Sequence, residues 1–203
     1  MRTRSTSPKE IPKLAKQMTK EVLRALVIAV LVFAGLPAAR ADVVNSAADG
    51  FTVKATVNIH ASPADVYRKI VKEVGNWWDS GHTFSGDAHN MSIDERPMGC
   101  FCEKLSGNGA IRHMEVIYFQ PGKLLRMSGA IGPLQSLAVS GIATFNLSAD
   151  GDGTKLEFTY AVGGYSPTGL DKIAPVANSV LTEQITRLKN YIETGNPAGK
   201  DKQ

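Results

Sequence analysis

The chain has 203 residues, of which 43% are hydrophobic and 21% charged, and this composition excludes a disordered, collagen-like or fibrous protein. The formal net charge is +4, but residues 1–41 hold eight Lys and Arg against two Glu, whereas residues 42–203 hold 15 bases against 17 acids. The body of the chain is therefore slightly acidic, which argues against a nucleic-acid-binding domain.

The N-terminal segment has the organisation of a secretory signal. Its apolar run, residues 25–36, is shorter than the roughly 20 residues that span a bilayer, and bases precede it. Ala39, Arg40 and Ala41 then supply the small-x-small pattern of a signal peptidase site. We predict a cleaved signal peptide over residues 1–41, export to the periplasm and no stable membrane insertion of the mature protein. An uncleaved anchor is the alternative, and Met18 is a second possible start.

The first part of the mature chain reads as a lead-in, a strand and a helix. Residues 42–50 predict a flexible lead-in, and residues 51–59 alternate apolar and polar side chains as a half-buried strand does. Ser62, Pro63 and Asp65 are typical of a helix N-terminus, and Gly75 is expected to end that helix. Residues 76–79 then start a second short element.

The remainder predicts hairpins followed by a long helix. Strand-like runs at residues 91–96, 99–105, 111–119, 124–128, 140–147 and 155–162 are separated by turn residues, which indicates an antiparallel meander. Apolar residues then recur at helical spacing over residues 170–192 and stop at Gly195. Pro175 either starts this helix or kinks it. Residues 196–203 are expected to be a disordered tail.

This order predicts an α+β helix-grip fold, because a long helix with one apolar stripe must bury it against the curved sheet. We expect about seven antiparallel strands wrapped around the C-terminal helix, with one or two short helices after the first strand, in one domain of residues 51–195. Residues 59–67, the pair Trp77 and Trp78, and residues 119–127 resemble the START-related superfamily, the polyketide cyclase/dehydrase and lipid-transport group. That resemblance implies hydrophobic ligand or lipid binding, cyclase chemistry or contact with a protein partner.

One predicted hairpin brings together side chains that could carry chemistry. If Gly107 and Asn108 form its centre, facing residues have numbers that add up to 215. Glu103 then lies opposite Arg112, Cys102 opposite His113 and Cys100 opposite Glu115, and an ion pair between Glu103 and Arg112 would favour this register. One face of the hairpin would then carry Cys100, Cys102, His113 and Glu115.

Three interpretations of this group stay open. Cys102 could be a nucleophile with His113 as base and Glu115 as orienting group, or all four side chains could hold zinc. They could equally be two buried thiols and a hydrogen-bonded histidine that pack the sheet. A disulfide between Cys100 and Cys102 is not expected unless a bulge intervenes, because alternate strand residues lie about 6.5 to 7 Å apart.

A ligand cavity is expected between the sheet and the C-terminal helix, with residues 128–136 as either a mobile flap or a plain crossing loop. The leading hypothesis is an exported protein that binds a small hydrophobic or amphipathic molecule, without a cofactor, since no diagnostic enzyme or nucleotide motif is present. The alternatives are a cyclase or hydrolase using His113 and Glu115, and a protein-interaction module of the chaperone-activator type. The expected wall of the cavity comprises Trp77, Trp78, His82, Phe84, Cys100, Cys102, His113, Glu115, Met127 and Tyr160. The oligomeric state is left open.

Overall fold

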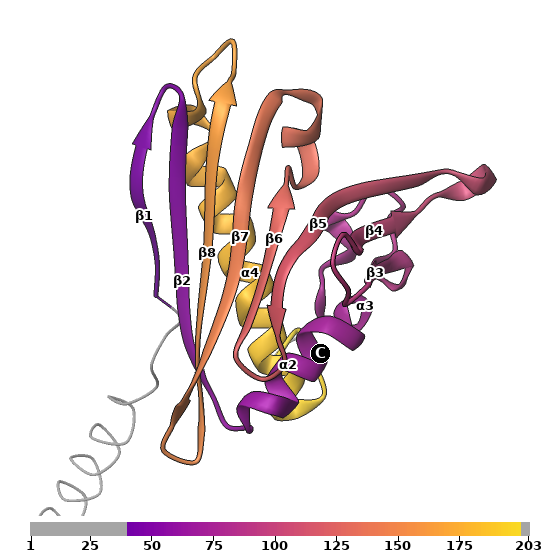
Figure 1. Cartoon of the computed structure of the whole chain (residues 1–203), viewed down its shortest axis with the longest axis vertical. Coiled ribbons are helices and arrows are strands. Elements are labelled where there is room, and N and C mark those ends of the chain that lie inside the picture. Colours follow the sequence, from indigo (N-terminus) through magenta and orange to yellow (C-terminus); the bar gives the residue numbers. More distant parts are fainter. Residues whose placement is uncertain (1–39, 200–203) are drawn as a thin grey trace, which may run out of the picture. The chain divides into compact units, whose positions relative to one another are not determined.

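Eight antiparallel strands and one long helix make up most of the described chain, which is residues 40–199 of a computed structural model (Figure 1). The predicted signal peptide lies outside the described residues except for Arg40 and Ala41, and so do residues 200–203 of the predicted tail. In chain order the elements are β1 (Arg40–Ala47), β2 (Gly50–Ile59), α2 (Pro63–Lys72), α3 (Val74–Trp77), β3 (Met91–Ile93), β4 (Cys100–Lys104), β5 (Ala110–Gln120), β6 (Leu124–Gly129), β7 (Ala138–Asp150), β8 (Gly153–Tyr165) and α4 (Ala174–Thr194).

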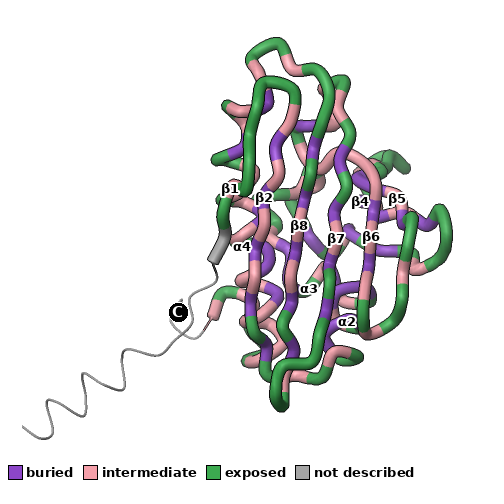
Figure 2. The backbone as a smooth tube through the Cα atoms, turned by 60° about the vertical axis from the view of Figure 1, so that its left-hand side comes forward, coloured by how far each residue is buried: buried purple, intermediate pink, exposed green. Residues whose placement is uncertain are grey.

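The strands form a single sheet in the order β1-β2-β8-β7-β6-β5-β4-β3. Helix α4 crosses one face of this sheet and contacts β2, β1 and the two short helices (Figure 1). Buried residues alternate with intermediate or exposed ones along β2 and β8, as they must where one face of a sheet covers a core and the other meets water (Figure 2). The structure therefore has the predicted α+β helix-grip architecture.

The two predicted helices form for the expected reasons. The hydroxyl of Ser62 accepts a hydrogen bond from the Asp65 amide and caps α2, with Pro63 in its first turn. Helix α4 starts at Ala174, so Pro175 lies in its first turn and does not kink it. Gly195 ends α4 in the left-handed conformation with φ of 75°.

The prediction that Gly75 ends the first helix is wrong, since α2 ends at Lys72. Gly75 lies inside α3, where a Cβ atom would come within 2.9 Å of the Ala88 carbonyl oxygen. The glycine is needed here because α3 packs closely against the backbone of the turn at Ala88–Asn90.

The sheet has eight strands rather than about seven, and the additional strand is β1. Residues 42–47, expected to belong to a flexible lead-in, pair with β2, and a register irregularity lies between Val43 and Asn45. Most of β1 is exposed (Figure 2). A strand that buries so little shows no apolar alternation, so its sequence resembles a polar lead-in.

The register predicted for β4 and β5 is correct at one end and wrong at the other. Cys100 pairs with Glu115 as expected, but Cys102 pairs with Arg112, because the register shifts by one residue. His113 is the extra residue of this β-bulge and has no partner in the ladder. Glu103 lies on the inner face with Phe101 by the regular alternation of β4, and the extra residue on β5 turns His113 to the same face, so both side chains are buried.

Candidate functional site

A cavity of about 590 Å³ lies between α4, β8 and two loops, which is within the usual size range of small-molecule sites. The first loop is residues 78–84 after α3, and the second is residues 131–137 between β6 and β7. The second loop overlaps residues 128–136, the segment expected to be a flap or crossing loop, of which Ser128 and Gly129 belong to β6. Helix α4 and the turn before it contribute one apolar wall, made of Ile173, Val176, Ala177, Val180 and Leu181. Apolar side chains therefore dominate the lining.

The polar atoms on the inner wall are mostly engaged with the protein itself. The Tyr160 hydroxyl donates to the Gly129 carbonyl and accepts from the Ile131 amide, both at 3.2 Å. Burial raises the pKa of Tyr160 to about 12, so the hydroxyl stays neutral. The indole nitrogen of Trp78 donates to the His82 carbonyl at 3.1 Å. The buried part of a ligand would therefore meet mainly apolar surface and the faces of aromatic rings.

The mouth of the cavity carries charges of both signs. Among the lining residues His82 and Lys172 are exposed, and each lies beside a carboxylate. Lys172 Nζ is 2.7 Å from Asp171, and His82 Nε2 is 3.6 Å from Glu183. Asp171 balances the charge of Lys172, and a carboxylate also lies beside the His82 ring, so the mouth has no excess of positive charge that would favour an anionic ligand.

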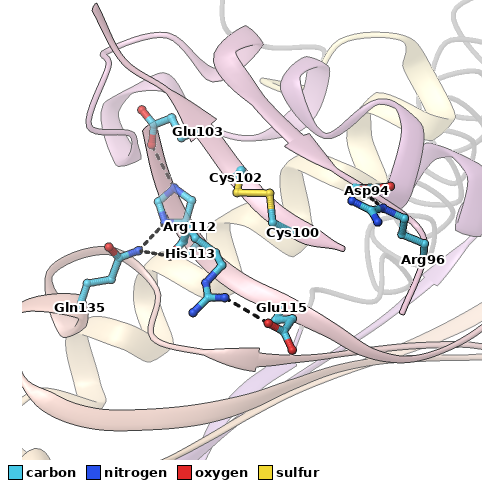
Figure 3. The surroundings of a disulfide bond; sticks show 9 residues. All are labelled: Asp94, Arg96, Cys100, Cys102, Glu103, Arg112, His113, Glu115 and Gln135. Atoms are coloured by element: carbon cyan, nitrogen blue, oxygen red, sulfur yellow. Dashed lines mark hydrogen bonds and ion pairs between the residues drawn. A yellow bond between two sulfur atoms is a disulfide. The ribbon is translucent and has the colours of Figure 1, made fainter. Parts of the chain in front are cut away.

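A buried polar network connects the two loops that line the cavity (Figure 3). His113 Nε2 lies 3.0 Å from a carboxylate oxygen of Glu103, and His113 Nδ1 lies 3.1 Å from the side-chain nitrogen of Gln135 (Figure 3). Glu103 also accepts a hydrogen bond from the Ser85 amide. Ser85 directly follows the first loop and Gln135 belongs to the second, while Phe84 contacts the His113 ring. Glu103 and His113 thus hold both loops by hydrogen bonds on the side away from the cavity.

The surroundings of Glu103 and His113 determine the protonation state of each side chain. Burial raises the pKa of Glu103, but hydrogen bonds from Ser85, Phe84 and His113 outweigh this effect and hold the pKa below its ordinary value. Burial lowers the pKa of His113, and Glu103 opposes this only in part. At neutral pH the network therefore consists of an ionised Glu103 and a neutral His113, which donates through Nε2 and accepts at Nδ1 from Gln135.

The structure brings four of the predicted wall residues to the cavity and places the other six elsewhere. Trp78, His82, Phe84 and Tyr160 line it. Trp77 and Met127 are buried in the core, and the Trp77 indole donates to the Lys69 carbonyl. His113 lies behind the cavity with both ring nitrogens engaged. Cys100, Cys102 and Glu115 lie on β4 and β5 away from it.

The predicted grouping of two thiols, His113 and Glu115 on one face does not occur. Cys100 and Cys102 form a disulfide, with their Cα atoms 5.3 Å apart, so neither is a free nucleophile or metal ligand. The spacing is shorter than the roughly 6.5 Å of an extended strand, and the register shift between β4 and β5 lies at the same place. Glu115 forms an ion pair with Arg112 at 3.1 Å, whereas Glu103 is the carboxylate beside His113. No group of three or more His, Cys, Asp and Glu in residues 40–199 is arranged to hold a metal ion.

The residues of the α4 wall were not among those predicted to line the cavity. Its residues were expected only to bury the helix against the sheet, yet Val176 is 65% exposed and Ala177 and Val180 are only partly buried. One feature of the sequence could have indicated this wall. The apolar stripe extends to the first turn of α4, although the main buried contact of the helix is made further along it by Leu181, Ile185 and Leu188. No helix in the described part of the chain has the length and apolarity needed to cross a membrane.

Comparison with solved structures finds the same fold in proteins of low sequence identity. A conserved protein of unknown function from Enterococcus faecalis has a TM-score of 0.54 at 16% identity, covering 81% of this chain and 82% of that one. The Aha1 dimer from Colwellia psychrerythraea has a TM-score of 0.52 at 18% identity, covering 71% and 97%. The Mll3558 protein from Rhizobium loti has a TM-score of 0.51 at 22% identity, covering 68% and 96%. No protein-family model and no curated protein matches the sequence. The likeness shows that this chain has a helix-grip fold.

Proposed function

We propose that the protein binds a small hydrophobic or amphipathic molecule in the cavity between α4, β8 and the two loops. The observation that carries this proposal is the volume of about 590 Å³ lined mainly by apolar side chains. Exposed apolar surface of this kind is costly in water, and an apolar ligand removes that cost. The resemblance to the START-related superfamily supports the same function.

The mouth suggests the chemistry of the ligand. Because Lys172 and His82 each lie beside a carboxylate, an ionised headgroup would gain little from either. We therefore propose an uncharged polar group at the mouth and an apolar body inside. At equal chain length, an alcohol should bind at least as well as the carboxylate or the quaternary ammonium compound.

The test is a titration of the tryptophan emission, to which Trp78 on the cavity wall contributes, with 1-decanol, decanoate and decyltrimethylammonium. We expect saturable binding, with 1-decanol at least equal to the two ions. Ala177→Phe adds a ring to the cavity wall and should weaken binding at least tenfold, whereas Ala64→Phe adds the same ring on the exposed face of α2. Equal affinity in the two variants would contradict the proposed site.

The buried network favours binding over catalysis. An acid–base role for His113 needs a ring nitrogen that can reach a substrate, but Glu103 and Gln135 occupy both nitrogens and the residue is 3% exposed. We propose that Glu103 and His113 position the loops of the cavity and do not act on a ligand.

We also propose that the protein is exported and cleaved after Ala41. The disulfide supports this proposal, because such bonds persist mainly in oxidising compartments outside the cytosol. Cleavage would leave β1 paired with β2 from Asp42 onward. Intact mass measurement of protein from the periplasm of a Gram-negative host should give a chain that begins at Asp42. Full-length protein confined to the membrane fraction would overturn the proposal.

A further inference from the structure

The Cys100–Cys102 disulfide lies on the outer face of the sheet, away from the cavity. Both cysteines are half-buried, and the residues opposite them in the ladder are Glu115 and Arg112 (Figure 3). Directly opposite residues in a sheet share a face, so the disulfide lies beside this ion pair of partly exposed side chains. The disulfide is therefore partly exposed and has charged neighbours, the environment in which we expect a water-soluble thiol to reach it.

This disulfide adds little as a structural cross-link. It joins residues two positions apart within β4, a strand that β3 and β5 already hold by hydrogen bonds on both sides. The entropic stabilisation from a cross-link grows with the length of the loop that it closes, and here the loop contains only Phe101 between the two cysteines. Its presence therefore calls for a different explanation.

The bond is coupled to the backbone at the one place where β4 and β5 lose their regular register. The shift lies between Phe101 and Cys102, and the Cα atoms of the cysteines are 5.3 Å apart where an extended strand gives about 6.5 Å. Without the bond, β4 is free to extend at Phe101. That side chain points to the inner face, where its ring contacts Trp78 at 5.5 Å and His113 at 5.3 Å between centroids.

We propose that Cys100–Cys102 is an exchangeable disulfide, and that its redox state is passed through Phe101 to Trp78 on the cavity wall. A dithiol, either a small molecule or a CxxC-type protein, is the reductant. Its thiolate attacks one sulfur of the pair, forming a mixed disulfide and releasing the other cysteine as a thiolate, which takes up a proton. The second thiol of the reductant loses its proton and attacks the reductant's own sulfur in the mixed disulfide, which breaks the bond to the second cysteine and releases it as a thiolate that also takes up a proton. The products are two cysteine thiols and an oxidised dithiol, with two electrons transferred.

The experiment treats the folded chain with dithiothreitol without denaturant, adds iodoacetamide and measures the intact mass. We expect two alkyl groups to be incorporated while the far-ultraviolet circular dichroism is unchanged. In a parallel sample without iodoacetamide, we expect the tryptophan emission to change on reduction and to return on reoxidation. The Cys100→Ser, Cys102→Ser variant controls for effects of dithiothreitol elsewhere and should show no change in emission.

Three results would overturn the proposal. Alkylation that requires a denaturant would show a protected structural bond, and loss of circular dichroism on reduction would show that the fold depends on the bond. Complete alkylation with unchanged tryptophan emission would refute the link to the cavity wall. The wild-type measurements decide the matter even if the double variant does not fold. The proposal is independent of ligand binding, because every readout uses the protein alone.

Discussion

Replacing Glu103 by Leu should destabilise the protein strongly, because it leaves a buried and a partly buried donor without an acceptor. Glu103 is fully buried and accepts hydrogen bonds from the Ser85 amide and from His113 Nε2. Each donor left unsatisfied in the interior costs about 1 to 3 kcal/mol, so the free energy of unfolding should fall by about 2 to 6 kcal/mol. The same change should loosen the loop of residues 78–84 and weaken binding of 1-decanol.

Equilibrium urea unfolding at pH 7, followed by circular dichroism, measures the loss of stability. Glu115→Leu is the matched control on the same hairpin, since Glu115 makes only a partly exposed ion pair with Arg112 and should cost no more than about 1 kcal/mol. If Glu103→Leu costs less than about 1 kcal/mol, or no more than Glu115→Leu, the argument for a buried anchoring network is refuted.

Three further predictions concern the buried pair and the packing around Tyr160. The pKa values of Glu103 and His113 are both lower in the folded protein, so the unfolded chain binds more protons in acid and the free energy of unfolding should fall as the pH drops below about 6.5. Urea unfolding at a series of pH values measures this fall. Between about pH 6.5 and 4.5 the fall should be smaller in His113→Gln than in the wild type. Tyr160→Phe removes the hydrogen bonds to Gly129 and from Ile131, and should cost about 1 to 2 kcal/mol in the same assay and increase amide hydrogen exchange at Ile131. Gly141→Ala would place a Cβ atom 2.5 Å from Tyr160 Cε2, so it should lower the free energy of unfolding by about 1 to 3 kcal/mol and alter the near-ultraviolet circular dichroism. An unchanged spectrum and an unchanged stability would contradict this close packing of Gly141 against Tyr160.

The fold was predictable where local patterns and burial agree. Ser62 and Pro63 mark the start of α2, Gly195 marks the end of α4, and alternation along residues 51–59 marks β2. Strand β1 was not predictable in this way, because it lies at the edge of the sheet and buries few side chains. Its pairing depends on the neighbouring strand rather than on its own sequence.

The candidate site was predicted in part. Aromatic residues after the first helix indicated the mouth, and Trp78, His82 and Phe84 do line the cavity. The carboxylate partner of His113 was assigned wrongly, because the prediction assumed an unbroken register through the hairpin. A bulge has no reliable signature in a single sequence, yet it decides which face each residue occupies.

The disulfide that was not expected lies at the same place as the bulge. Cys100 and Cys102 are too far apart in a regular strand, whereas their Cα atoms are 5.3 Å apart beside the register shift. Both departures from the prediction therefore occur at the one irregular position of this hairpin.

The central claim is that an uncharged amphipathic molecule binds between α4, β8 and the two loops. Chemical-shift mapping by nuclear magnetic resonance, with 1-decanol added to the labelled protein, tests it most directly. We expect the largest shifts at Leu134, Tyr160 and Ala177, which line the cavity. Shifts concentrated at Ile142 and Ala161, in the shallow groove lined by β1, β2, β7 and β8, or no shifts at saturating 1-decanol, would contradict it.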